Sequence, residues 1–435
     1  MHHLLPKLIH PTLPRRRGEE LRMLRRWIYR SLKLASLIAL LVVLCGACWW
    51  WTRPTLEARD LHVVSEGVLA TKYDDVAGEA TGMVRQVATD LRLPSVSIAV
   101  GVDGDLVWSA AIGLSDVAGR NATTPQTRYR TGSVAKPMTG VVLAQLIIDG
   151  RLDPDVGVRQ YLPGYPGKRW DPTPRQLASH TGGVRHYSEI GHPSFVAEQF
   201  SKQHYASVTD ALQLFRDDPL EFEPETNFLY STHGFTLLSA TMEAAAGRPF
   251  ETLMNELWSD REMTRTTFDD FIRPPRGRAT PYVVMRNRAV HVEGPDPSYK
   301  WAGGGMLSTP EDLVRLGSSL FDRGYVRVDR RHELFEPRPL ADGSENPQRY
   351  AMGWRNDTQT DLLKSSEPLA VLHHGGQCPG GSSFLLVVPN GKVVAATMTN
   401  ASIRDPWPLR EATYRIAGMF RQASLAKPST DSRHD

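Results

Sequence analysis

The chain has 435 residues, enough for one large domain or two ordinary ones. Its hydrophobic fraction of 41% and charged fraction of 23% are those of a globular protein and exclude a disordered chain. The net charge of +3 is small and comes largely from an N-terminal arginine cluster, so the composition predicts no nucleic-acid partner. Three cysteines are too few for a disulfide framework.

The N-terminal segment joins a basic region to an apolar run. Residues 1–33 are rich in arginine, and residues 34–51 form an uncharged run that ends in three tryptophans. A helix of this length comes close to crossing a hydrocarbon core, and tryptophans favour the membrane interface. The positive flank precedes the run. We therefore predict a basic cytoplasmic segment over 1–33 and a transmembrane helix over 34–51, with the rest of the chain exported.

Three alternatives compete with a retained anchor in a bacterial inner membrane. A cleaved signal peptide would have an unusually long basic region, and tryptophans stand where small residues should precede cleavage. A lipoprotein signal at Cys48 would have Cys45 where leucine is expected. A mitochondrial transit peptide should be poor in acids, but Glu19 and Glu20 interrupt this one. We favour a single-pass inner-membrane protein with its globular part in the periplasm, and keep a mitochondrial location as the alternative.

Local patterns beyond residue 51 predict short strands at both ends of the chain and helices in the middle. A polar linker over 52–75 precedes the globular domain at 76–421, and a flexible tail follows over 422–435. Asp103-Gly104 and Asn390-Gly391 are hairpin signals between apolar runs. The expected elements are a helix at 76–91, strands at 95–102 and 106–112, a helix after Ser133, a helix at 235–246, a helix start at 308–312, strands at 383–388 and 392–398, and a helix at 409–421.

This order of elements predicts an α/β (α+β) fold. Strands from the two ends of the chain would form one antiparallel sheet flanked by helices. The region between about 151 and 225 is loop-rich, as expected of an insertion over a site. A mostly helical subdomain would then lie over the sheet.

One stretch carries a recognisable chemical pattern. Ser133 and Lys136 are three residues apart at the start of an apolar helix that ends near Gly150. Residues three apart share one face of a helix, so the lysine amine can lie beside the serine hydroxyl. A helix N-terminus also offers backbone N–H groups to a developing oxyanion. The same tetrapeptide occurs by chance as a helix cap followed by a surface lysine, so it needs support from elsewhere in the chain.

Three later stretches bear on this serine. Tyr230 stands just before an apolar helix, a histidine-glycine stretch at 373–383 leads into the C-terminal hairpin, and 298–309 contains a run of three glycines. Glycines at a strand edge allow a substrate backbone to approach closely. His180-Thr-Gly182 has a sequence pattern similar to that of the histidine-glycine stretch. It precedes Tyr230, however, and no strand is predicted after it. We interpret it as a structural turn.

In this order the motifs resemble those of the serine β-lactamase and penicillin-binding protein family of the class C type. The resemblance covers about 76 to 421, and it includes the stretches 175–184, 230–247 and 301–309. Within the family, 298–309 and 180–187 are most similar to the mitochondrial serine β-lactamase-like proteins. The implied fold is that of the DD-peptidases and β-lactamases, which agrees with the fold predicted from the element order.

The resemblance implies a role for each matching residue. Ser133 would be the nucleophile, Lys136 its base and Tyr230 the proton relay. The oxyanion would lie between the backbone N–H groups of Ser133 and Gln377, and His374 would position the substrate. Other substrate-contacting positions of the matching motifs are Thr232, Gly375 and Gly376. An alignment without a gap selects His374, whereas one inserted residue would select His373. No metal and no cofactor are implied, since the histidines lack ligand spacing.

Three positions depart from the family pattern. Thr232 stands where asparagine is usual, Gly375 replaces a hydroxyl residue, and His374 replaces a lysine. β-Lactamases hold the substrate carboxylate with those lost side chains. Histidine is mostly neutral at pH 7 and glycine has no side-chain donor. We therefore expect poor hydrolysis of benzylpenicillin and better turnover of neutral esters or of peptides with a free amine.

The function predicted from these residues is a membrane-anchored serine hydrolase that acts on amide (peptide) bonds through an acyl-enzyme. An esterase on the same fold is one alternative. A membrane-anchored scaffold with little catalysis is the other, as filament formation in the mitochondrial relatives implies. The expected partners are a small peptide or ester substrate, the membrane through one helix, and further copies of the chain in a homo-oligomer.

Overall fold

The computed structural model describes residues 16–62, 64–188, 190–321 and 335–426. The chain divides into two compact units, Met1–Arg53 and Pro54–Asp435. The first unit consists of helix α1 (Arg16–Trp51). Its stretch Arg22–Trp51 contains an 18-residue window with a mean hydropathy of 2.2 and is long and apolar enough to cross a membrane, as a signal sequence would also be. The span predicted at 34–51 lies within this helix.

The second unit contains one large antiparallel sheet with the strand order β1-β3-β2-β13-β12-β11-β10. Strand β2 pairs with β13, so the N-terminal and C-terminal strands of the chain meet in the middle of the sheet. The strands are β1 (Val64–Val68), β2 (Ser95–Val102), β3 (Asp105–Asp116), β10 (Arg355–Gln359), β11 (Leu369–Cys378), β12 (Gly381–Val388) and β13 (Val393–Thr399). The predicted antiparallel sheet built from both ends of the chain is confirmed.

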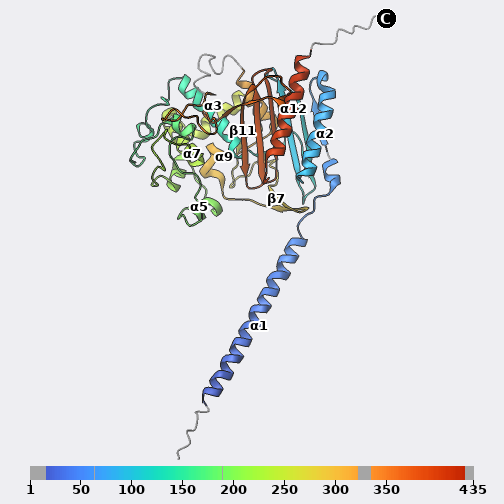
Figure 1. Cartoon of the computed structure of the whole chain (residues 1–435), viewed down its shortest axis with the longest axis vertical. Coiled ribbons are helices and arrows are strands. Elements are labelled where there is room, and N and C mark those ends of the chain that lie inside the picture. Colours follow the sequence, from blue (N-terminus) through green and yellow to red (C-terminus); the bar gives the residue numbers. More distant parts are fainter. Residues whose placement is uncertain (1–15, 63, 189, 322–334, 427–435) are drawn as a thin grey trace, which may run out of the picture. The chain divides into compact units, whose positions relative to one another are not determined.

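Helices cover both faces of this sheet (Figure 1). On one face lie α2 (Asp74–Asp90) and α12 (Trp407–Leu425). On the other face α10 (Pro310–Ser319) packs against the strands, and the helical subdomain extends from there. Strand β12 shows the result, because Leu385 and Val387 enter the core of the helical subdomain while Phe384, Leu386 and Val388 enter the core under α12. The central strands β2, β12 and β13 are therefore buried at every position.

The helical subdomain is built from residues that lie between β3 and β10 in the chain. Its principal helices are α3 (Ala135–Ile148), α7 (Thr232–Ala246), α8 (Phe250–Asp260) and α9 (Trp301–Gly304). The smaller elements are β4 (Asn121–Ala122), α4 (Pro174–Ala178), α5 (Phe195–Phe200), α6 (Val208–Ala211), the sheet β5 (Tyr129–Arg130)-β9 (Met306–Ser308)-β6 (Thr267–Phe268), and the hairpin β7 (Tyr282–Met285)-β8 (Arg288–His291).

The structure differs from the sequence-based expectation at both ends of the domain. The segment 52–75, expected to be a linker, contains strand β1, which pairs with β3 and extends the sheet. The polar residues of this segment gave no strand signal in the sequence, because an edge strand exposes one side to water. At the other end α12 continues to Leu425, four residues beyond the expected helix end at 421. The rest of the expected tail, 427–435, lies outside the described residues.

Candidate active site

Ser133 lies in a single 3-10 turn (Gly132–Val134) that leads directly into helix α3. Lys136 follows in the first turn of α3, and its Nζ is 3.3 Å from the Oγ of Ser133. The serine is partly exposed, whereas the lysine is completely buried. The turn requires glycine at 132, because its φ is +48° and an added Cβ would lie 2.7 Å from the backbone nitrogen of Gln377.

The Lys136 amine is surrounded by neutral groups. It donates to the carbonyl of Gly303 at 2.7 Å and lies 3.3 Å from Oγ1 of Thr232. Among the described residues no carboxylate pairs with it. Burial lowers the pKa of Lys136 well below its ordinary value, and the positive charges of Arg355 and Lys300 lower it further. The lowered pKa favours the neutral amine, which can accept the proton of the Ser133 hydroxyl.

Tyr230 stands two residues before helix α7 and closes the other side of this arrangement. Its side chain interacts with Ser133, and the Nζ of Lys136 lies 4.7 Å from its ring centroid. Burial raises the pKa of Tyr230, so the phenol stays protonated and can donate a proton. His180 packs against this ring at 4.3 Å between centroids and accepts from the backbone nitrogen of Ser231. The turn at His180 thus supports the tyrosine from behind.

Strand β11 passes directly beside the turn that bears Ser133. A Cβ on Gly376 would collide with the carbonyl of Thr131 and lie 3.1 Å from the backbone nitrogen of Ser133. Ser383 fixes the contact, because its Oγ donates to the same carbonyl at 2.6 Å. The backbone nitrogen of Gln377 is therefore next to the Ser133 turn, in the place expected for an oxyanion donor.

The two histidines of β11 point to opposite faces of the sheet. His374 is completely buried on the Gly376 side, and its Nε2 is 2.8 Å from the hydroxyl of Tyr350. Burial lowers its pKa well below the ordinary value, so the ring is neutral. His373 points to the α12 side and lies 2.6 Å from Asp357. Of the two alternatives, His374 is the one on the side of Tyr230, with 6.3 Å between the ring centroids.

The sequence motifs did not identify Arg355 and Arg410 as cations near this site. The guanidinium of Arg355 lies 5.7 Å from the ring centroid of Tyr230, and that of Arg410 covers Gly375. Lys300 is buried nearby and acts electrostatically on Lys136. His374 and Gly375 supply no cation, whereas Arg355 and Lys300 place positive charge near Lys136. Neither arginine stands in a motif, and only the three-dimensional fold brings them to β11.

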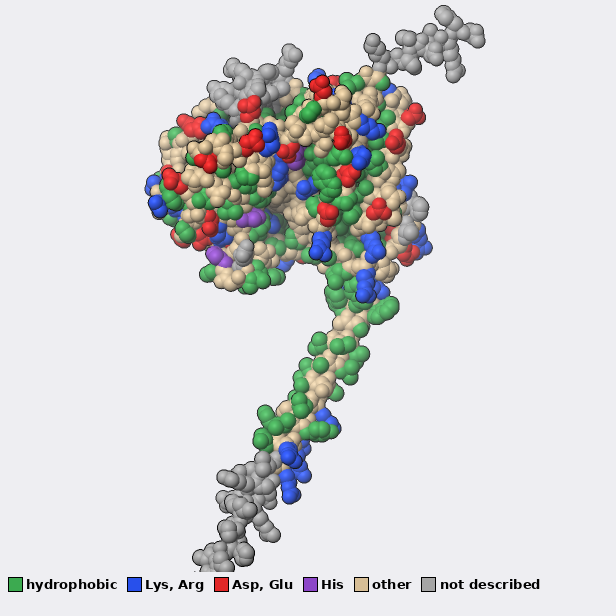
Figure 2. Space-filling model, in the orientation of Figure 1, with side chains coloured by type: hydrophobic (Ala, Val, Ile, Leu, Met, Phe, Trp, Pro, Cys, Tyr) green, Lys and Arg blue, Asp and Glu red, His purple; other side chains and the backbone are tan. Residues whose placement is uncertain are grey.

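The molecular surface is hollowed between the sheet and the helical subdomain, and Lys and Arg side chains gather at this hollow (Figure 2). The glycines within 301–305 pack closely against neighbouring residues beside this hollow. A Cβ on Gly303 would lie 2.7 Å from Cγ2 of Thr232, and Gly304 lies against Gly132. Within the described residues no group of three or more His, Cys, Asp or Glu side chains is arranged to hold a metal ion.

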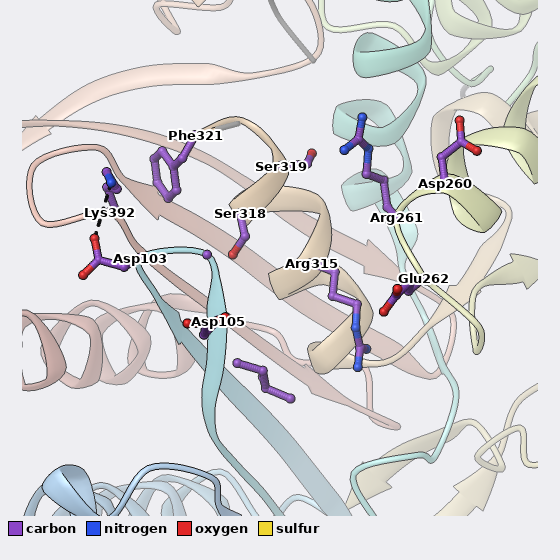
Figure 3. Close-up of a pocket in the computed structure, with 12 residues that line it drawn as sticks. Asp103, Asp105, Asp260, Arg261, Glu262, Arg315, Ser318, Ser319, Phe321 and Lys392 are labelled. Carbon is purple, nitrogen blue, oxygen red and sulfur yellow. Dashed lines mark ion pairs between the residues drawn. The ribbon is translucent and has the colours of Figure 1, made fainter. Parts of the chain in front are cut away.

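A second cavity lies at the opposite tips of the sheet (Figure 3). The tips of the β2–β3 and β12–β13 hairpins line it together with the ends of α8 and α10. Asp103 and Lys392 face each other across the two hairpins at 3.5 Å (Figure 3). This cavity shares no residue with the cleft at Ser133, and its charged side chains are solvent-facing rather than convergent.

A protein-family model described as beta-lactamase matches residues 80–417. The chain therefore belongs to this family of serine hydrolases, as the motifs predicted. It is 29% identical over 390 residues to the human protein "Serine beta-lactamase-like protein LACTB, mitochondrial", and the match covers 71% of each chain.

Solved structures of the same fold have different recorded activities. A D-stereospecific amidohydrolase from Streptomyces matches with a TM-score of 0.62 and 23% identity over 76% of this chain and 98% of that one. EstCE1, a hydrolase with promiscuous acyltransferase activity, matches with a TM-score of 0.68 and 18% identity over 80% of this chain and 100% of that one. An octameric penicillin-binding protein homologue from Pyrococcus abyssi matches with a TM-score of 0.63 and 21% identity over 79% and 77%. The TM-scores show a shared fold, and at identities this low they show the fold alone.

Proposed function

We propose that the protein is a membrane-anchored serine hydrolase that cleaves amide (peptide) bonds through an acyl-enzyme. The observation that carries this proposal is the contact of Ser133 with both Lys136 and Tyr230. A buried lysine without a carboxylate partner is a base, and a buried protonated tyrosine beside it is an acid. A purely structural serine would need neither.

The proposed reaction has two halves. Lys136 takes the hydroxyl proton while the Oγ of Ser133 attacks the substrate carbonyl, and the backbone N–H groups of Ser133 and Gln377 stabilise the oxyanion. Tyr230 then passes a proton to the leaving nitrogen, the C–N bond breaks, and an ester to Ser133 remains. Water attacks this ester in the second half with the same residues acting in reverse, and the acid product leaves.

An esterase would use the same residues with an alcohol as the leaving group. The first experiment is labelling with a neutral fluorophosphonate, followed by mass spectrometry of the adduct, which should be on Ser133. The second compares kcat/KM for a matched pair of substrates, one acyl group as its 4-nitroanilide and as its methyl ester. Measurable turnover of the anilide supports the amidase. Labelling with turnover of the ester alone would establish the esterase instead.

We also propose that α1 is a retained anchor and that the domain beyond it is exported, in a bacterial inner membrane or, alternatively, in a mitochondrion. The basic flank before the apolar run supports this orientation. A reporter enzyme that is active only outside the cytoplasm should work when fused after residue 60. If a reporter that works only in the cytoplasm is active at the same position, the orientation is refuted. Release of the domain into the soluble fraction would indicate that the N-terminal segment is cleaved.

A homo-oligomer remains part of the proposal. The octameric state recorded for the Pyrococcus abyssi homologue is the observation that favours it. A scaffold that assembles without catalysis is disfavoured, because the lysine and tyrosine beside Ser133 would then serve no purpose.

A further inference from the structure

The loop 185–188 encloses the carboxylate of Glu198, which projects from α5 and is completely buried. Its Oε2 accepts from the backbone nitrogen of Ser188 at 2.6 Å and from the hydroxyl of the same residue at 2.8 Å. Its Oε1 lies 2.8 Å from Nη2 of Arg185 and 3.3 Å from Nε2 of His233, which is also completely buried. Both carboxylate oxygens thus hold the loop against the helices around it.

The charge of this carboxylate is fixed by its neighbours. Burial opposes the ionisation of Glu198, but His233, Arg185 and the backbone of Ser188 lower its pKa to about 2. Arg185 balances the charge and also pairs with Asp218 at 2.5 Å. A buried ion pair often gives no more stability than apolar side chains of the same volume. The cluster is therefore better explained by the orientation that it imposes on the loop.

The same loop makes two polar contacts with the start of α7. The backbone carbonyl of Arg185 accepts from Oγ of Ser231 at 2.6 Å. Nδ1 of His186 accepts from the backbone nitrogen of Thr232 at 3.2 Å. The Oγ of Ser231 in turn caps α7 by accepting from the backbone nitrogen of Gly234 at 2.8 Å. The orientation of the loop therefore sets where α7 begins.

The residues held in this way are the neighbours of the proton-transfer groups. Ser231 and Thr232 directly follow Tyr230, and Oγ1 of Thr232 lies 3.3 Å from Nζ of Lys136. The ring of His186 meets the ring of Tyr230 edge to face, with 5.6 Å between the centroids. A small displacement of a catalytic group can cost a large factor in rate. The buried carboxylate is thus connected to the phenol through the loop and the start of α7.

We propose that Glu198 is a positioning residue that acts through Tyr230 on protonation of the leaving group. This proposal rests on the proposed hydrolase and adds a residue to its mechanism. In the step concerned, Lys136 holds the proton taken from Ser133. Tyr230 gives its phenol proton to the leaving atom as the bond from this atom to the acyl carbon breaks, and Lys136 returns a proton to the phenolate. Glu198 exchanges no proton and does not touch the substrate.

The test compares kcat/KM of the full-length protein for the methyl ester and the 4-nitrophenyl ester of one acyl group. Methoxide leaves only when it is protonated, whereas 4-nitrophenolate leaves without a proton. Glu198→Gln should lower kcat/KM at least about tenfold for the methyl ester and less than about threefold for the nitrophenyl ester. Glu256→Gln is the matched control, because Glu256 is exposed on α8 and pairs with Arg248, and both values should stay at the parent level.

A second substitution tests whether the effect passes through the tyrosine. Tyr230→Phe should show the same selective loss with the methyl ester. Adding Glu198→Gln to Tyr230→Phe should then leave the ratio of the two kcat/KM values unchanged, because residues that act as a unit have non-additive effects. Equal losses with both esters in Glu198→Gln would overturn the positioning role, since a lower folded fraction reduces both alike. A further fall of the ratio in the double variant would also overturn it.

If Glu198→Gln does not fold, a pair of variants at His186 tests the same connection. His186→Leu removes the acceptor for the backbone nitrogen of Thr232 and should lower the ratio of methyl ester to nitrophenyl ester turnover. His186→Asn keeps an acceptor oxygen near the position of Nδ1 and should restore most of the ratio. Equal ratios in the two variants would overturn the proposal. A parent protein that hydrolyses neither ester and is not labelled at Ser133 would instead overturn the hydrolase itself.

Discussion

Replacing Ser133 with alanine is expected to abolish labelling by a fluorophosphonate and to reduce turnover by about 10⁴-fold or more. The reason is the loss of the Oγ atom that would form the proposed acyl-enzyme. The partly exposed side chain loses one oxygen, so the melting temperature should remain close to that of the parent. Intact-mass measurement of the adduct and ester kinetics check the two expectations.

Ser65→Ala is the control for this substitution. Ser65 lies on the edge strand β1, where it pairs with Ala111 and has no contact with the cleft. Its variant should label and turn over like the parent. Undiminished ester turnover by Ser133→Ala would show that another group is the nucleophile.

Replacing Lys136 with methionine should reduce the rate of labelling by about 10³-fold, the usual size of a general-base contribution. Methionine fills a similar apolar volume, and burial of the lysine already disfavours its charged form, so folding should be retained. The parent rate should rise with pH through the pKa of Lys136. That limb should lie below the ordinary lysine range, because burial, Arg355 and Lys300 all lower the pKa.

The variant should lose this limb while the slow background rate stays nearly flat. Lys72→Met provides the comparison, because Lys72 is exposed and lies over the ring of Tyr73, outside the cleft. Retention of the same ascending limb in Lys136→Met would assign the titration to a different base and would contradict the mechanism.

Turn residues, residue spacing and the order of the family motifs made much of the fold and of the candidate site predictable. Asp103-Gly104 predicted the β2–β3 hairpin because both residues tolerate positive φ, and they have φ values of 56° and 102°. The spacing of Ser133 and Lys136 predicted their contact because both lie at one helix start. Tyr230 and Gln377 could be associated with them only through the family motifs, since nothing local relates positions so distant in the chain.

The cations of the cleft were unpredictable for a physical reason. Arg355 and Arg410 belong to an edge strand and to a helix on the other face of the sheet, and each looks like an ordinary surface arginine in the sequence. Gly375 was read as the loss of a donor, whereas the fold shows that it leaves space for Arg410. A contact between a strand and a helix so far apart in the chain has no signature in a single sequence.

The pairing of β2 with β13 sets the order in which this protein can become active during synthesis. The nucleophile turn is completed early, but the strand that carries Gln377 is made more than two hundred residues later. A sheet with such high contact order folds slowly and only when its last strands are available. A nascent or truncated chain that ends before β11 therefore contains Ser133 and Lys136 without an oxyanion donor. Its serine should be inert, so hydrolysis begins only after the whole domain has been released from the ribosome and folded.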